Sequence, residues 1–153
     1  IGEFLGTGAS MRELRRVRSG PLVEKESVTL QELEEASRKW RDKGDDSLLR
    51  ERIIPLEEVV DPILKKIVVK DTAVGAITHG ASVKAPGVSA FSPGIYKGEL
   101  IGIFTLKGEL VALARALVDS DNLRELERGV VAKPVRVIME RDIYPPLWRR
   151  SSS

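Results

Sequence analysis

The part of the chain that most restricts its fold begins near residue 67, where short apolar runs are separated by glycine and proline. Within 100–118, the runs LIGIFT and LVALARALV flank LKGE, which is typical of a β-hairpin, although propensity alone also allows a helix at 110–117. GVVAKPVRVIME at 129–140 predicts a closing strand in which Pro134 requires an edge or a bulge. Together these runs predict a small barrel, in a mainly β chain of the α+β class with short helices.

Two helices are expected from their capping signals. Thr29 and Glu32 have the spacing of a capping box, and the apolar stripe that follows predicts a helix over 29–41. Asp71 is expected to cap a short helix that ends near Gly80.

The N-terminal segment carries a cluster of arginines. Ser10 and Glu13 again have capping-box spacing, but the MRELRRV that follows fits a helix or a strand. The arginines at 12–18 are too dense to be buried together, so they must face solvent or an anion. From 32 to 61, acidic residues outnumber basic ones by ten to six, and we expect this region to face away from phosphate.

Composition excludes several kinds of site. The 153 residues contain no cysteine and one histidine, which removes disulfides, thiol catalysis, cysteine-bound metals and histidine-pair metal sites, so we expect no metal or cofactor. A net charge of +2 is too small to indicate nucleic-acid binding by itself. No apolar run approaches the roughly 18 residues of a membrane span, and no secretory signal is visible, so we expect no membrane contact and a cytoplasmic location.

At 71–88, DTAVGAITHGASVKAPGV resembles the helix-and-loop signature of a PUA domain, the small RNA-binding pseudo-barrel found on pseudouridine synthases and archaeosine transglycosylases. KGELIGIFTLKGELVALARA resembles the central hairpin of that domain. GVVAKPVRVIMERDIYPPLW resembles the closing strand and tail in the archaeal dyskerin-type pseudouridine synthases of H/ACA guide-RNA particles. IGEFLGTGASMRELRRVRSGP resembles the end of the catalytic domain of that family, and VTLQELEEA with RIIPLEEVVDPILKKIVVKDTAV resembles the connection.

The resemblance implies three regions: a catalytic-domain remnant with a connector at 1–65, a PUA RNA-binding domain at 66–148 and a tail at 149–153. No aspartate here stands in the catalytic motif of the family, its tyrosine and lysine motifs are absent, and Ser10 replaces a usual histidine. We therefore expect a C-terminal fragment or a truncated relative that is inactive alone. Its expected role is to anchor guide or tRNA-like RNA for pseudouridine synthesis by a complete enzyme.

The same resemblance implies an RNA site on the helix-loop segment and the closing strand, where the family holds an ACA trinucleotide. Glycines allow close backbone approach, Val83 or Pro86 can pack on a base, and cationic side chains can meet phosphates. The residues carried over are Lys70, His79, Gly80, Ala81, Val83, Lys84, Pro86, Gly87, Val88, Lys133 and Arg136. The glycines also fit plain helix-stop and turn positions, and Val83 also fits the core.

The arginine cluster has two interpretations. Arg15 and Arg16 are either a remnant of the active site or part of a basic face that pairs with acids or with RNA, and Arg12 and Arg18 are expected RNA-backbone contacts. Tyr144 and Trp148 are expected to pack the tail, although either ring could stack on RNA.

The implied partners are an H/ACA guide RNA, through its ACA trinucleotide and lower stem, and small protein subunits of the particle. The alternatives are an active isomerase, a PUA module of another RNA-modifying enzyme, and a protein-interaction fragment.

Overall fold

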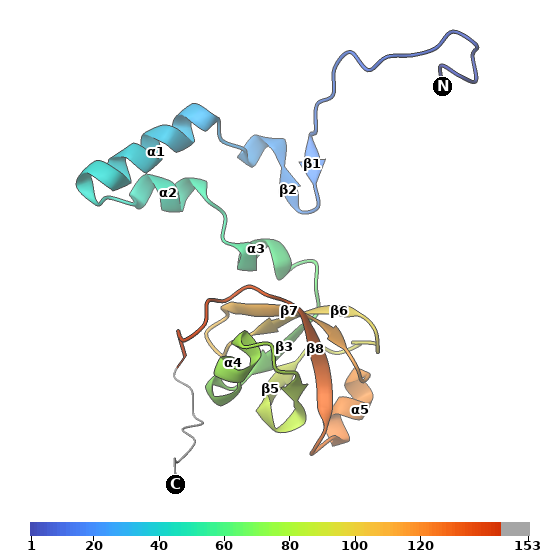
Figure 1. The fold of residues 1–153 in the computed structure, drawn as a ribbon, viewed down its shortest axis with the longest axis vertical. Helices are drawn as coiled ribbons and strands as arrows, with labels where there is room; N and C mark the ends of the chain where they lie inside the picture. The colour runs from blue at the N-terminus through green and yellow to red at the C-terminus, as the bar shows by residue number, and fades with distance from the viewer. Residues whose placement is uncertain (145–153) are drawn as a thin grey trace. The chain divides into compact units, whose positions relative to one another are not determined.

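The computed structural model describes residues 1–144 and divides into two compact units, Ile1–Ile53 and a second unit that starts at Ile54 (Figure 1). The predictions for Trp148, its neighbouring prolines and the 149–153 tail lie outside the described residues. Within those residues, no helix is long and apolar enough to cross a membrane.

The first unit consists of a hairpin and helices. Its elements are β1 (Arg18–Ser19), β2 (Leu22–Val23), a 3-10 turn (Glu24–Glu26), α1 (Leu30–Lys43) and α2 (Ser47–Arg52). The predicted capping box is confirmed: the Glu32 N–H donates to the Thr29 hydroxyl at 3.3 Å, and the Thr29 N–H donates to the Glu32 carboxylate at 2.7 Å. The helix ends at Gly44, which has a φ of 68°. The expected cap at Ser10 is wrong, because 10–17 forms neither helix nor strand.

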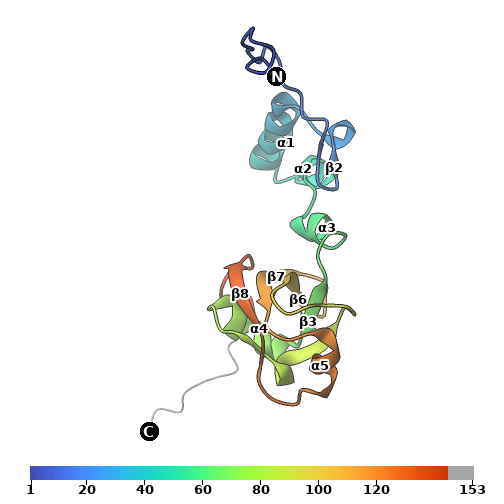
Figure 2. The same ribbon diagram turned by 90° about the vertical axis from the view of Figure 1, so that its right-hand side faces the viewer.

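The second unit is a six-stranded sheet with short helices (Figures 1 and 2). The strands are β3 (Lys66–Val69), β4 (Val83–Lys84), β5 (Val88–Phe91), β6 (Leu100–Phe104), β7 (Leu110–Ala116) and β8 (Val130–Val137). The helices are α3 (Leu56–Val60), α4 (Asp71–Thr78) and α5 (Ser120–Glu125), with a 3-10 turn at Ala85–Gly87. The strand order is β4-β8-β7-β6-β3-β5, in which only β3 and β6 are parallel.

The mainly β fold and the predicted hairpin are confirmed. β6 and β7 pair antiparallel across the turn, where Gly108 has a φ of 86°. Pro134 lies next to a register shift in the β7–β8 ladder, beyond the two β8 residues that pair with β4, so it meets the expected edge or bulge requirement. Asp71 is not the expected cap: Lys70 occupies the N-cap position, and no side chain caps α4.

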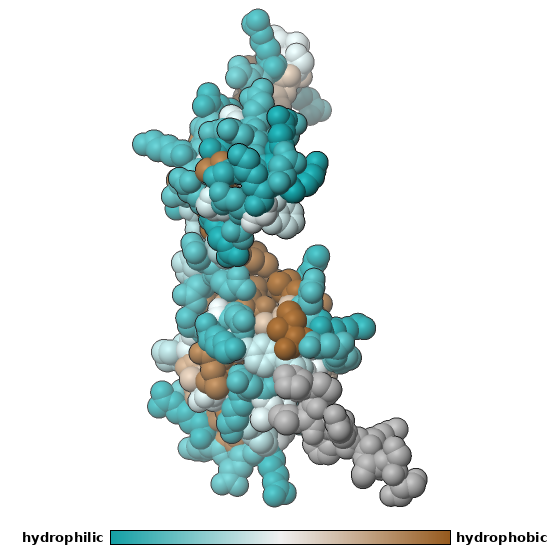
Figure 3. All heavy atoms as spheres, turned by 90° about the vertical axis from the view of Figure 1, so that its left-hand side faces the viewer, coloured by the Kyte–Doolittle hydropathy of each residue, from teal (hydrophilic) through white to brown (hydrophobic). Residues whose placement is uncertain are grey.

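The core of the second unit holds α4 against the sheet. Its largest fully buried side chains are Ile67, Val69, Val74, Ile77, Val83, Ile95, Ile101, Ile103, Val111 and Val131. Apolar side chains also reach the surface (Figure 3). In this unit Val135 and Leu106 are 61% and 58% exposed. Burying the β-branched side chains of the strands and one face of α4 fixes the position of the loop that follows α4.

Candidate nucleic-acid interface

A groove of about 560 Å³ lies between α4 and the segment 81–87, which we call the crook. Its lining residues are Thr72, Ala73, Ala76, Ile77, Ala81, Ser82, Val83, Lys84, Pro86 and Gly87. Most of these side chains are small or apolar, so planar rings and backbone groups of a ligand can approach the protein backbone closely.

The start of α4 holds the crook in place. The Lys70 N–H donates to the Gly87 carbonyl at 2.9 Å, and the Lys70 ammonium donates to the Pro86 carbonyl at 2.8 Å. A Cβ at Gly87 would lie 3.0 Å from the Ala73 Cβ, which explains why a glycine stands there. Lys70 is therefore a residue that positions the groove wall and does not line it.

The closing strand lies directly beside the crook. β4 pairs with β8, with Val83 opposite Ala132 and Lys84 opposite Val130, and the Ala85 N–H donates to the Gly129 carbonyl at 2.9 Å. Two segments that are some 45 residues apart in sequence thus form one surface.

The predicted residues of the helix-loop segment divide into groove residues and others. Ala81, Lys84 and Pro86 are exposed on the groove, whereas the Val83 side chain is 1% exposed and belongs to the core. Of the two apolar side chains expected to pack on a base, only Pro86 is accessible for that contact. Val88 lies in β5 opposite Val69, outside the groove.

His79 and Gly80 lie at the end of α4, where they line a separate hollow of about 360 Å³ with Val137 and the segment 139–141 that follows β8. The His79 Nδ1 is 2.8 Å from the Gly75 carbonyl oxygen, so Nδ1 carries a proton, because a carbonyl oxygen can only accept. Its Nε2 lies 3.8 Å from the Asp142 carboxylate.

Lys133 and Arg136 are exposed on β8, and their partners across the β7–β8 ladder are Arg115 and Leu113 respectively. Lys133 follows Ala132, the residue that pairs with Val83, and it does not line the groove itself. Among the groove's lining residues the cation is Lys84, and Lys133 stands on β8, the strand that pairs with the crook.

The arginine cluster lies in the first unit, where all four side chains belong to exposed residues. The Arg15 guanidinium pairs with the Glu24 carboxylate at 2.6 Å, as in the ion-paired interpretation. Arg18 donates from Nε to the Gly20 carbonyl at 3.0 Å.

Sequence reasoning missed one face of the groove. Thr72, Ala73, Ala76 and Ile77 recur at the spacing of one helix face, and this pattern was available in the sequence. The small alanines on that face gave no sign that it would be left open as a groove and not covered by another helix.

Tyr144 packs against the core, which confirms its packing interpretation. Its hydroxyl donates to the Glu109 carboxylate at 2.5 Å, and the Thr105 hydroxyl donates to the same oxygen at 3.0 Å. These two hydrogen bonds lower the pKa of Glu109, and the bond from Tyr144 contributes more than the bond from Thr105. The bond to Glu109 also raises the pKa of Tyr144.

Comparison with known families agrees with this geometry. Residues 1–61 match the tRNA pseudouridylate synthase B C-terminal domain, and residues 65–138 match the PUA domain. The chain thus carries a pseudouridine synthase C-terminal domain followed by a PUA domain.

Individual proteins and solved structures are similar to this chain over nearly its whole length. The probable tRNA pseudouridine synthase B of Korarchaeum cryptofilum is 53% identical over 149 residues, which cover 97% of this chain and 46% of that protein. In the crystal structure of the archaeal box H/ACA sRNP Nop10-Cbf5 complex, the matched chain is 44% identical with a TM-score of 0.83, over 96% of this chain and 47% of that one. In the structure of an H/ACA RNP bound to a substrate RNA containing 2′-deoxyuridine, the matched chain is 42% identical with a TM-score of 0.80. The match covers 96% of this chain and 46% of that one.

The chain spans less than half of these relatives. In sequence and fold it corresponds to the C-terminal part of the archaeal dyskerin-type pseudouridine synthases.

Proposed function

We propose that this chain binds RNA through the groove between α4 and the crook, and that it anchors a guide or tRNA-like RNA for a complete pseudouridine synthase. The observation that carries the proposal is the β4–β8 pairing, which joins a largely apolar groove lined by Lys84 to the strand that carries Lys133. An apolar floor favours unstacked bases, and cations at the rim favour phosphates. The proposal includes the domain limits expected from the sequence, a catalytic-domain remnant with its connector at 1–65 and a PUA domain at 66–148.

The proposed ligand is an RNA that presents an unpaired ACA trinucleotide beside a stem, as in an H/ACA guide RNA. The matched proteins come from structures described as H/ACA particles, one of them with substrate RNA. The proposed protein partners are small subunits of such a particle.

We also propose that the chain does not isomerise uridine by itself. Pseudouridine formation needs a carboxylate against a flipped uridine, and none of the aspartates here stands in the motif that supplies it in the family. Release of tritium from [5-³H]uridine RNA measures the reaction directly, and turnover by this chain would overturn this point.

Binding is tested with RNA hairpins that end in ACA or in UGU, at two salt concentrations. We expect a preference for ACA that persists as salt rises, because base contacts do not release counterions. Lys84→Gln should weaken binding, whereas Lys107→Gln removes the same charge from the exposed turn at the far end of the β6–β7 hairpin and should not. Equal, salt-sensitive binding of both hairpins would reduce the site to backbone attraction, and a stable dimer without RNA affinity would favour a protein-interaction module.

A further inference from the structure

Two cations face each other across the β7–β8 ladder without a carboxylate between them. Arg115 on β7 lies directly opposite Lys133 on β8, and both residues are exposed. Directly opposed strand residues share one face of a sheet, and like charges in that position are destabilising. Among the described residues, neither side chain forms an ion pair within the protein. The pair therefore has a cost in the free chain that a bound anion would remove.

The loop 96–99 extends this row on the other side of β7. The Arg115 guanidinium donates to the Gly98 carbonyl at 2.6 Å, and the Gly98 N–H donates to the Ala116 carbonyl at 2.8 Å. Leu117 on the opposite side donates to the Val131 carbonyl at 2.8 Å, so β8 flanks the same end of β7. Lys133, Arg115 and the loop thus lie next to one another, and β8 also pairs with the crook that lines the groove.

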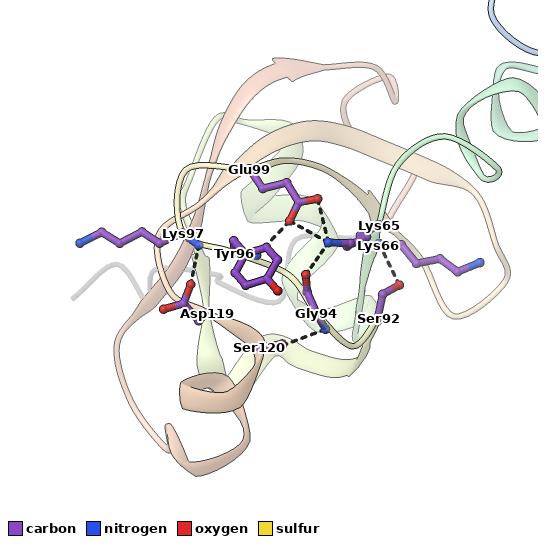
Figure 4. Close-up of polar contacts among 9 residues, drawn as sticks. All are labelled: Lys65, Lys66, Ser92, Gly94, Tyr96, Lys97, Glu99, Asp119 and Ser120. Atoms are coloured by element: carbon purple, nitrogen blue, oxygen red, sulfur yellow. Dashed lines mark hydrogen bonds and ion pairs between the residues drawn. The ribbon is translucent and has the colours of Figure 1, made fainter.

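The loop is anchored from within and presents two side chains outward (Figure 4). Ile95 is 1% exposed, and the Lys97 N–H donates to the Asp119 carboxylate at 2.7 Å. Tyr96 is 69% exposed, and the Lys97 side chain points away from the cluster of polar contacts. Because the backbone is already ordered, a ligand that contacts these side chains loses little loop entropy on binding.

Of the two acidic groups that hold the loop, Glu99 is ion-paired and Asp119 accepts a backbone N–H. The Glu99 carboxylate accepts from the Tyr96 N–H at 2.9 Å and pairs with the Lys65 ammonium at 3.0 Å, and these contacts lower its pKa. The Lys65 ammonium also lies 5.1 Å from the centroid of the Tyr96 ring. The exposed cations at this end of the sheet, Lys97, Arg115 and Lys133, thus outnumber the Asp119 carboxylate beside them.

We propose that Lys133, Arg115, Lys97 and Tyr96, which we call the outer row, form a second RNA subsite for a single-stranded extension that leaves the groove. Exposed cations carried by neighbouring backbone segments suit the successive phosphates of one flexible strand. An exposed tyrosine suits an unpaired base, since the bases of a duplex are already stacked on one another. The inference rests on the proposed groove function and adds the path of the strand beyond it.

The test compares a hairpin that ends in ACA with the same hairpin extended by six unpaired nucleotides beyond ACA. The wild-type chain should bind the extended RNA on the order of tenfold more tightly, and annealing a complementary strand to the extension should remove the gain. The double variant Lys97→Gln/Arg115→Gln and the variant Tyr96→Ala should bind the short hairpin normally and lose most of the gain. Tyr96→Phe and Arg115→Lys should retain it, because they keep the ring and the charge.

The outcomes separate the two proposals. If the wild-type chain fails to prefer the short ACA hairpin, the groove function itself is wrong. The outer row is not an RNA subsite if the wild-type chain prefers the short ACA hairpin but gains no affinity from the extension. It is also not a subsite if the double variant and Tyr96→Ala bind the extended RNA as tightly as Lys107→Gln does. Thermal melting of each variant by circular dichroism identifies any that fail to fold. The test then uses the folded variants, each compared with its conservative partner, Tyr96→Phe or Arg115→Lys.

Discussion

The Lys70 ammonium donates to the Pro86 carbonyl at 2.8 Å, and the Lys70 N–H donates to the neighbouring Gly87 carbonyl at 2.9 Å. One residue before α4 thus holds two consecutive carbonyls of the crook. The proposed groove exists because this double contact, with the β4–β8 pairing, keeps the crook at a fixed distance from the helix.

Lys70→Met removes the ammonium contact and retains most of the aliphatic chain. We expect a loss of about 1 kcal/mol in the free energy of unfolding, the usual contribution of one such hydrogen bond, and weaker ACA binding because the crook becomes mobile. Urea denaturation and fluorescence anisotropy measure the two effects. Lys66→Met removes a cation that pairs with Asp61 and serves as the control for general charge loss; an equal loss of ACA binding in both variants would contradict a specific role for Lys70.

Gly87→Ala should push the crook away from α4. The added Cβ would lie 3.0 Å from the Ala73 Cβ, and both atoms are fixed to backbone. We expect a destabilisation of about 1–2 kcal/mol and a loss of ACA preference. The double variant with Ala73→Gly removes the clash, so ACA preference should return even though glycine in the helix costs about 1 kcal/mol. No recovery in the double variant would show that the close approach does not control binding.

Glu109→Gln tests the contact with Tyr144. The pKa of Glu109 is lowered from its ordinary value of 4.5, so its charged form stabilises the fold above that pH, and this contribution is lost as pH falls through the lowered pKa. At pH 7 the variant should be about 1 kcal/mol less stable than the wild-type chain. The difference should shrink below pH 4.5. Urea denaturation at both pH values gives the comparison; a difference that grows in acid would refute the assignment, and Tyr144→Phe should reproduce much of the loss.

Thr29→Ala removes the capping box of α1. The loss of the hydroxyl that accepts the Glu32 N–H should cost about 1 kcal/mol of helix stability. Hydrogen exchange of the amides in the first turn of α1 should accelerate several-fold, because the first turn frays. Amides in β7 should exchange at the wild-type rate, and Thr29→Ser should restore protection.

The features predicted most successfully from sequence are local ones. Thr29 and Glu32 are three residues apart, so the capping box forms within one helical turn and is visible in the sequence. The β6–β7 hairpin is also predictable from local sequence, because the glycine that its turn requires, Gly108 with a positive φ, lies within the turn itself. Ser10 and Glu13 show the limit of this reasoning: the same spacing begins no helix, because short helices need a packed apolar face and Leu14 remains 74% exposed.

The amino-acid sequence alone determined the capping box of α1, the hairpin turn, the strand-forming runs and the residues from which an RNA site could be built. Only the tertiary structure decided that β4 lies against β8, that Val83 is core while Pro86 is exposed, and that Arg115 faces Lys133. The two strand pairings join residues that are between 18 and about 50 positions apart in the sequence. Strand pairing between such residues depends on the burial of the whole core at once, which no short stretch of sequence encodes.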